Sequence, residues 1–181
     1  MVCGMDPQNK ITVDQNCSEI VDTLLSANAE LYATDYHGWT GIMMAASRGM
    51  LKYLESFFKV LPDSSFINRQ NIDGRTALML SAVNGHYLIY EYLVGKAADI
   101  TLKDNNGLTS LHYAVLRAVS NSSELSVEKE KLVDYAGYAA SLHSVVDALD
   151  NNNRTALMYA TIGRSVEIVE KCCFNTSLIL C

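Results

Sequence analysis

The chain has 181 residues, of which 49% are hydrophobic and 19% are charged, so it carries enough apolar side chains to fold around a core. Its 20 acidic and 14 basic residues give a net charge of −6, which argues against general binding to nucleic acids or anionic membranes, because both use an excess of Lys and Arg. No apolar run is long enough for a transmembrane helix, and the first residues lack the basic and apolar regions of a signal peptide.

Four segments of the chain repeat one phrase. An Asp or Asn is followed by Gly or Asn at the fourth position, by Thr at the sixth, and then by small and apolar residues. The threonines of the phrase lie 36, 33 and 46 residues apart, and they are Thr40, Thr76, Thr109 and Thr155. A period near 33 residues with insertions indicates a solenoid, in which each unit buries its apolar face against its neighbours.

Each copy of the phrase predicts a tight turn followed by two helices. Asp and Asn favour Asx turns, Gly or Asn tolerates a positive φ, and the Thr hydroxyl can cap the first helix. Gly49 and Gly85 stand where a helix C-cap glycine belongs, whereas Asn153 and Arg164 occupy glycine positions in the last copy. The residues predicted to point inward are Met43, Met79 and Met158 on the first helices, and Leu51, Leu54, Phe58, Leu88, Ile89, Tyr92, Leu93, Val166, Ile168 and Val169 on the second helices.

The phrase D-x-x-G-x-T-[AP]-L-x-x-A-A-x-x-G-H, which residues 71–86 match most fully, resembles the ankyrin repeat. Met43, Met79 and Met158 stand where that family usually has His, and His112 keeps it. This variant resembles the long ankyrin arrays of some protists, which occur alone or fused to NIMA-related kinases. The resemblance implies an all-α solenoid of helix-turn-helix units joined by short β-hairpin-like turns.

In chain order, the predicted units begin with a degenerate or partial repeat at residues 1–17 and the second helix of a leading half repeat at 18–34. Four ankyrin repeats follow, at 35–70, 71–103, 104–149 and 150–181, and the last of them includes a C-terminal tail. The third repeat carries an insertion at about 120–130, which predicts a solvated loop or, alternatively, a specific docking loop.

No motif in the chain points to catalysis, a cofactor or a metal. It lacks a nucleotide-binding glycine loop, the zinc-protease motif H-E-x-x-H and the kinase loop signatures. The histidines fall at different repeat positions, so we expect structural roles for them, with Thr109 and His112 able to support each other at a helix start. We therefore expect a protein that is not an enzyme and has no cofactor, metal or small-molecule substrate.

The five cysteines indicate a reducing compartment, because their number is odd and no C-x-x-C pair occurs. We expect a cytoplasmic location, with association with the cytoskeleton as an open alternative. The adjacent Cys172 and Cys173 fill apolar space in one interpretation and carry a lipid or a redox function in the other.

Ankyrin repeats generally bind protein partners through the tips of their turns and the exposed side of the first helix, which together form a concave face. Carried over repeat by repeat, the resemblance implies that the contact residues are Tyr36, His37, Trp39, Arg48, Arg75, Asn105, Asn106, Leu108, Arg117 and Arg154. Ile72 and Asn151 occupy the same turn position as Tyr36 and Asn105.

Four of the six arginines fall on that face of an otherwise acidic chain, and they are Arg48, Arg75, Arg117 and Arg154. Trp, Tyr and Arg are enriched at binding hot spots, and a guanidinium group suits carboxylates and phosphates. We therefore predict an acidic or phosphorylated peptide partner, anchored on Trp39. The alternative is that the arginines only pair with aspartates of the turns, such as Asp73, Asp104 and Asp150.

The predicted function is non-catalytic protein–protein interaction, as a scaffold or adaptor. The alternative is a regulatory or targeting ankyrin segment of a larger enzyme such as a protein kinase, whose catalytic part would lie outside these residues.

Overall fold

The computed structural model describes residues 19, 22–24, 26–27, 30, 33–60, 64–120, 134–139 and 145–170, and over this part of the chain its secondary structure is helical, with no strand. The elements are α2 (Gly41–Arg48), α3 (Leu51–Val60), the 3₁₀ helix η1 (Ser64–Asn68), α4 (Ala77–Asn84), α5 (Tyr87–Gly95), α6 (Ser110–Ser120) and α8 (Ala156–Ile162). Residues 134–139 and 166–170 are also helical. The expected all-α fold is thus confirmed. The predicted insertion at about 120–130, the adjacent cysteines and the C-terminal tail lie outside the described residues.

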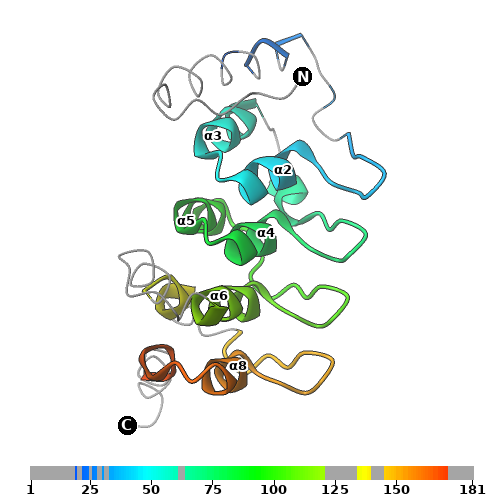
Figure 1. Cartoon of the computed structure of the whole chain (residues 1–181). Coiled ribbons are helices and arrows are strands. Elements are labelled where there is room, and N and C mark those ends of the chain that lie inside the picture. The colour runs from blue at the N-terminus through cyan, green and yellow to red at the C-terminus, as the bar shows by residue number, and fades with distance from the viewer. Residues whose placement is uncertain are drawn as a thin grey trace.

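The helices form two parallel rows (Figure 1). Helices α2, α4, α6 and α8 stack as the first row, while α3, α5 and the segments 134–139 and 166–170 form the second row. Four turns project from the first row, on the side away from the second. Consecutive helices of the first row contact one another. In addition, α2 contacts α3, and α4 contacts α5. Each unit therefore buries its apolar side on its neighbours, as a solenoid requires.

Threonine side chains start three helices of the first row. In each case the hydroxyl oxygen accepts the backbone N–H three residues further on, at 3.2–3.3 Å, and these threonines are Thr40, Thr76 and Thr155. Gly49 and Gly85 follow α2 and α4 in the left-handed conformation, with φ of 77° and 74°. Both the predicted N-caps and the predicted glycine C-caps are confirmed at these positions.

At the start of α6, the threonine hydroxyl contacts a histidine side chain instead of a backbone N–H group. The hydroxyl of Thr109 lies 2.8 Å from Nδ1 of His112, and the backbone N–H of Thr109 donates to the same nitrogen at 3.2 Å. Because Nδ1 accepts, the proton of the neutral ring lies on Nε2. The mutual support predicted for this pair is confirmed.

The core lies between the two rows, and three predicted inward positions are wrong. Met43 and Met79 are each 1% exposed, whereas Met158 is 47% exposed, since α8 lies at the end of the row that the described helices form (Figure 1). Leu88 and Val166 also point outward, with exposures of 53% and 67%. The buried side chains of α5 are Ile89, Tyr90 and Leu93.

Helix α6 has 11 residues, whereas α2 and α4 have 8 each, because Ala118 stands where a glycine ends the shorter helices. The extra turn brings Val119 against Gly163, where an added Cβ would lie 2.0 Å from Cγ1 of Val119. Gly163 itself is right-handed, with φ of −74°, and Arg164 takes the left-handed conformation, with φ of 55°. The glycine is therefore required by close packing, and the next residue turns the chain out of the helix.

Candidate partner-binding face

The four turns share one internal design. In each turn, Oδ1 of the leading Asp or Asn accepts the backbone N–H groups two and four residues further on, at 2.7–3.0 Å. The leading residues are Asp35, Asn71, Asp104 and Asp150. The predicted Asx turns are confirmed, and they hold the turn tips in fixed positions.

Hydrogen bonds also join each turn tip to the one before it. Backbone N–H groups of Ile72, Asn105 and Asn151 donate to carbonyl oxygens of the preceding tip, at 2.9–3.0 Å. The side-chain amides of Asn105 and Asn151 add a second bond in the same direction, at 2.8 and 2.9 Å. We call this chain of bonds the tip ladder. It occupies the amide of Asn105, so this predicted contact residue holds neighbouring tips together.

Two glycines make room for the tip ladder. Gly74 and Gly107 have φ of 76° and 78°, and a Cβ on either would lie 2.6 Å from the side-chain oxygen of the asparagine in the next tip. These asparagines are Asn105 and Asn151. In the fourth turn the corresponding residue is Asn153, with φ of 57°. Asparagine accepts this conformation at a lower energetic cost than other residues with a side chain.

Tyrosines connect the turns to the helices beside them. The hydroxyl of Tyr113 donates to Oδ2 of Asp104 at 2.7 Å, and that of Tyr159 donates to Oδ2 of Asp150 at 2.5 Å. In the second turn Asn71 takes the place of these aspartates, and its Nδ2 is buried without a hydrogen-bond partner. The residue nine positions on, which is Tyr in the later repeats, is Leu80 there.

These tyrosines hold two of the four predicted arginines. Nε of Arg75 donates to the hydroxyl of Tyr113 at 3.0 Å, and its guanidinium lies 5.3 Å from the centre of that ring. The guanidinium of Arg154 lies 5.9 Å from the ring centre of Tyr159. Arg75 and Arg154 thus contact a tyrosine that is itself bound to a turn aspartate, which is an arrangement that neither of our alternatives anticipated.

The pKa values of one tyrosine and one aspartate at the face are shifted by these contacts. Burial, followed by the hydrogen bond to Asp104, raises the pKa of Tyr113 to about 12. At Asp150, desolvation raises the pKa, but hydrogen bonds from Tyr159, Arg154 and Asn152 outweigh it and lower the pKa to about 2. At physiological pH the hydroxyl of Tyr113 is therefore neutral and the carboxylate of Asp150 is ionised.

The other two arginines are placed differently. Arg48 is exposed in the last turn of α2, and Arg117 in α6 is half-buried. Nε of Arg117 is buried and has no hydrogen-bond partner. Buried donors in proteins are almost always paired, so the unpaired Nε makes this position of the Arg117 side chain unfavourable.

The remaining predicted residues surround the turn tips. Tyr36 is fully exposed, and His37 and Asn106 are exposed as well. Trp39 and Leu108 are half-buried and pack against the core, so their outer parts alone can reach a partner. Ile72 is 60% exposed at the position equivalent to Tyr36, which gives the first two tips an apolar character.

Two histidines join neighbouring repeats, as their structural assignment predicted. Nε2 of His86 lies 3.1 Å from the carbonyl oxygen of Ser47, and Nε2–H of His112 donates to the carbonyl of Arg154 at 3.2 Å. Burial lowers the pKa of His112, which keeps the ring neutral. Among the described residues no group of three His, Cys, Asp or Glu is placed to hold a metal ion, and no helix is long and apolar enough to cross a membrane.

The second row contains a cavity that the sequence did not predict. Its volume is about 320 Å³, and it is lined by Tyr87, Glu91, Asp134, Tyr135 and Tyr138. The tyrosines recur three residues apart in two segments, at positions 87 and 90 and at positions 135 and 138, which is the signal that could have indicated it.

A family model described as ankyrin repeats in three copies matches residues 10–104 and 42–125. The chain belongs to the ankyrin repeat family. Repeats of this family generally mediate protein–protein interaction and are generally not catalytic.

Several longer proteins resemble this ankyrin chain. It is 27% identical over 108 residues to the human transient receptor potential cation channel subfamily A member 1, covering 60% of this chain and 10% of the channel subunit. It is 30% identical over 99 residues to the palmitoyltransferase AKR1 of Lachancea kluyveri, covering 54% of this chain and 13% of that protein. It is 34% identical over 80 residues to the rat ankyrin repeat and SAM domain-containing protein 6, covering 44% of this chain and 9% of that protein. The chain spans about a tenth of the length of these relatives.

Proposed function

We propose that this ankyrin chain is a non-catalytic binding module, a scaffold or adaptor of the cytoplasm, whose face of turn tips and first-row helices binds an acidic or phosphorylated segment of a protein partner. Its family membership supports the binding of proteins. The arginines, together with the exposed Tyr36 and Ile72, support the choice of this face.

The observation that carries the proposal is the buried, unpaired Nε of Arg117. A guanidinium N–H that is buried without an acceptor destabilises the free protein, and turning the half-buried Arg117 outward onto an anionic oxygen of a partner would remove that cost. A carboxylate or a phosphate is the acceptor for which the planar guanidinium is best suited.

Arg75 would add a second, positioned cation in the preceding repeat. Tyr113 engages both its Nε and the face of its guanidinium, so its terminal nitrogens are the groups available to a ligand. A side chain that is already held in place loses little conformational entropy on binding. Arg75 and Arg117 would therefore act together, with Arg48 contributing a longer-range attraction to anions.

The test compares two variants of equal charge. One is Arg48→Glu with Arg117→Glu, which leaves the tyrosine contacts of Arg75 and Arg154 intact. The control is Lys52→Glu with Lys59→Glu, whose lysines are exposed on α3 in the second row. Each would be applied to a peptide array in which every sequence is present with serine, phosphoserine and aspartate.

We expect the native chain and the lysine control to retain a set of phosphoserine or acidic peptides, and the arginine variant to bind them about tenfold or more weakly. An equal loss in both variants would mean that net charge, and not this face, attracts the peptides. If neutral peptides are retained as well as acidic ones, the acidic-ligand proposal fails.

The alternative is that the chain is a regulatory or targeting segment of a larger enzyme, such as a protein kinase of the NIMA-related type. One relative is by name an enzyme, the palmitoyltransferase AKR1, of which the matched region makes up 13%. An antibody against this chain, used on an extract of the source cells, distinguishes the proposals. A band near 20 kDa supports the small adaptor, and a much larger band supports the enzyme segment.

A further inference from the structure

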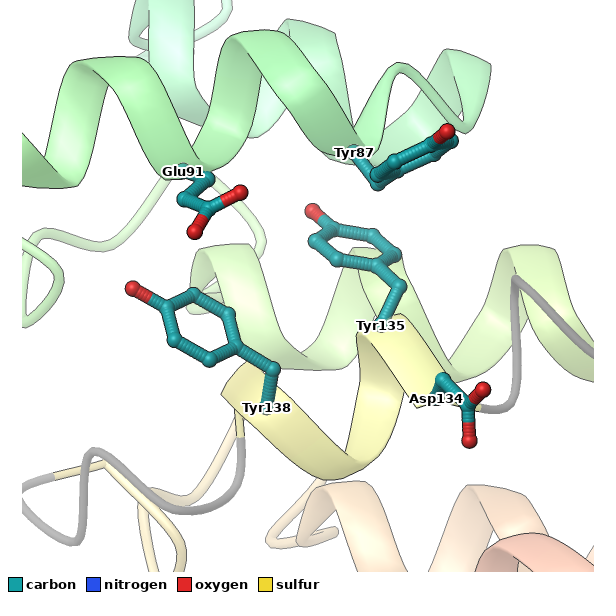
Figure 2. A pocket seen from close by; sticks show the side chains of 5 residues that line it. All are labelled: Tyr87, Glu91, Asp134, Tyr135 and Tyr138. Atoms are coloured by element: carbon teal, nitrogen blue, oxygen red, sulfur yellow. The ribbon is translucent and has the colours of Figure 1, made fainter.

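The cavity in the second row lies between α5 and the helical segment 134–139, on the side of the molecule away from the turn tips (Figure 1). It measures about 320 Å³ and opens to solvent. Tyr87 and Glu91 line it from α5, and Asp134, Tyr135 and Tyr138 line it from the other segment (Figure 2). Two exposed tyrosines, two exposed carboxylates and a buried tyrosine thus surround one space.

The buried tyrosine has an unused polar atom. Tyr135 is 4% exposed, and its hydroxyl oxygen is buried without a hydrogen-bond partner. Figure 2 shows this hydroxyl directed at α5, between Glu91 and Tyr87. Buried hydroxyl groups are almost always hydrogen-bonded, so the hydroxyl of Tyr135 marks a place for a ligand atom.

The ring of Tyr135 is held in position from behind. Tyr90 meets it edge to face, with ring centres 4.8 Å apart and planes at 79°, and lies 6.4 Å from the ring of Tyr138. The hydroxyl of Tyr90 is in turn hydrogen-bonded to the hydroxyl of Ser110 at 3.1 Å. The aromatic wall of the cavity therefore exists before any ligand binds.

The charge of the cavity selects a cation. Helix α5 and the segment 134–139 carry Glu91 and Asp134 and no basic residue. In Figure 2 Glu91 lies beside Tyr138 and faces the cavity, while the carboxylate of Asp134 points away from the other four side chains. One carboxylate and several tyrosine rings do not make a metal site, because burial raises the pKa of Tyr135 well above its ordinary value and keeps its hydroxyl protonated.

We infer that this cavity binds the guanidinium group of an arginine side chain presented by a protein partner, at a site separate from the turn tips. A guanidinium group stacks on tyrosine, is weakly hydrated, and has N–H donors enough for both the hydroxyl oxygen of Tyr135 and the carboxylate of Glu91. A quaternary ammonium group has no N–H to offer the hydroxyl. A primary ammonium group is more strongly hydrated and has no planar face.

The test uses the full chain with isotope-labelled tyrosine rings, observed by NMR. The probes are the acetylated amide of arginine, that of citrulline as its neutral isostere, and that of lysine. We expect the arginine probe to shift the ring signals of Tyr87, Tyr135 and Tyr138 in a saturable way with millimolar affinity, the lysine probe to bind several-fold more weakly, and citrulline to leave the signals unchanged.

Two variants separate binding from folding. Glu91→Gln should weaken the arginine probe about fivefold to tenfold, because it removes the charge and little volume. Tyr135→Phe should weaken it about threefold and at the same time raise the melting temperature, because it deletes an unpaired buried hydroxyl. The matched control is Tyr36→Phe at the exposed first tip, which should change neither quantity.

Opposite signs for affinity and melting temperature in Tyr135→Phe are the result that a purely structural role would not give. Equal shifts with arginine and citrulline would overturn the inference, and so would unchanged affinity in both Glu91→Gln and Tyr135→Phe. Equal affinity for the lysine and arginine probes would overturn the assignment to guanidinium.

Discussion

Single residues decide how each turn binds its neighbours. Asp104 and Asp150 use one carboxylate oxygen for the turn and the other for a tyrosine hydroxyl. In Asn71 the side-chain nitrogen Nδ2 is unpaired, because Leu80 stands in place of the tyrosine. The same local phrase in the sequence therefore has different energetics in different repeats. The difference depends on a residue nine positions away.

Asp150 should make the protein sensitive to acid. Its pKa is about 2 in the folded chain against an ordinary value of 3.8, so the stability that it contributes is complete above about pH 4 and is lost as the pH falls towards about 2. We expect Asp150→Asn to be less stable at neutral pH and to lose less stability between pH 4 and 2. Urea unfolding across this range measures both effects.

The control for that experiment is Asp73→Asn, since Asp73 is an exposed residue of a turn tip. If the two variants show the same dependence on pH as the native chain, the bonds from Tyr159 and the turn do not set the acid limit. A direct titration of the Asp150 carboxyl carbon by NMR would then show whether its pKa is ordinary.

At the scale of the helices, the length of one element fixes the sequence of another. The extra turn of α6 carries Val119, which occupies the space beside Gly163 and forbids a side chain there. Arg164 consequently takes the left-handed conformation that Gly49 and Gly85 take after α2 and α4. The displaced glycine of the fourth repeat is a response to the longer helix of the third.

This dependence predicts a compensating pair of substitutions. Gly163→Ala should lower the free energy of unfolding by about 2 kcal/mol, because the new Cβ would lie 2.0 Å from Cγ1 of Val119. Val119→Ala alone should cost about 1 kcal/mol through lost packing, and the double variant should recover part of the loss caused by Gly163→Ala, since the Cβ of residue 119 would still lie 2.9 Å from the new Cβ. Urea denaturation of the four proteins gives the coupling energy, and strictly additive effects would contradict the contact.

The sequence predicted those features that depend on residues a few positions apart in the chain, such as the caps at Thr40 and Gly49 and the pairing of Thr109 with His112. It did not predict features that depend on packing between repeats. Met158 has the local pattern of Met43 but is exposed, because the described helices place α8 at the end of the row. The contact of Arg75 with Tyr113 spans 38 residues, and the tyrosine cavity combines two segments that are more distant still.

The whole molecule is a stack in which each repeat is stabilised by the repeats beside it. Residues 77–82 of α4 are all buried, since α4 lies between α2 and α6, whereas the buried residues of α8 are Ala156 and Ala160. In such a stack the stability is local and need not be the same in every repeat.

We therefore expect graded protection of backbone amides along the solenoid. The amides of α4 should exchange most slowly, those of α2 faster, and those of α8 faster again, with opening free energies that differ by about 1–2 kcal/mol between α4 and α8. Hydrogen exchange measured by mass spectrometry on peptides from these helices tests the order. Equal protection in all three would show that the described repeats unfold as one unit.

Asn153 has a consequence for anyone who wishes to lengthen this protein by design. At Gly74 and Gly107 the neighbouring turn comes within 2.7 Å of where a Cβ would be, and Asn153 places a side chain at the equivalent point of the fourth turn. A repeat grafted after it in the same register would meet that side chain. Asn153→Gly is thus the first substitution that such a graft needs, and a library of extended arrays should begin from it.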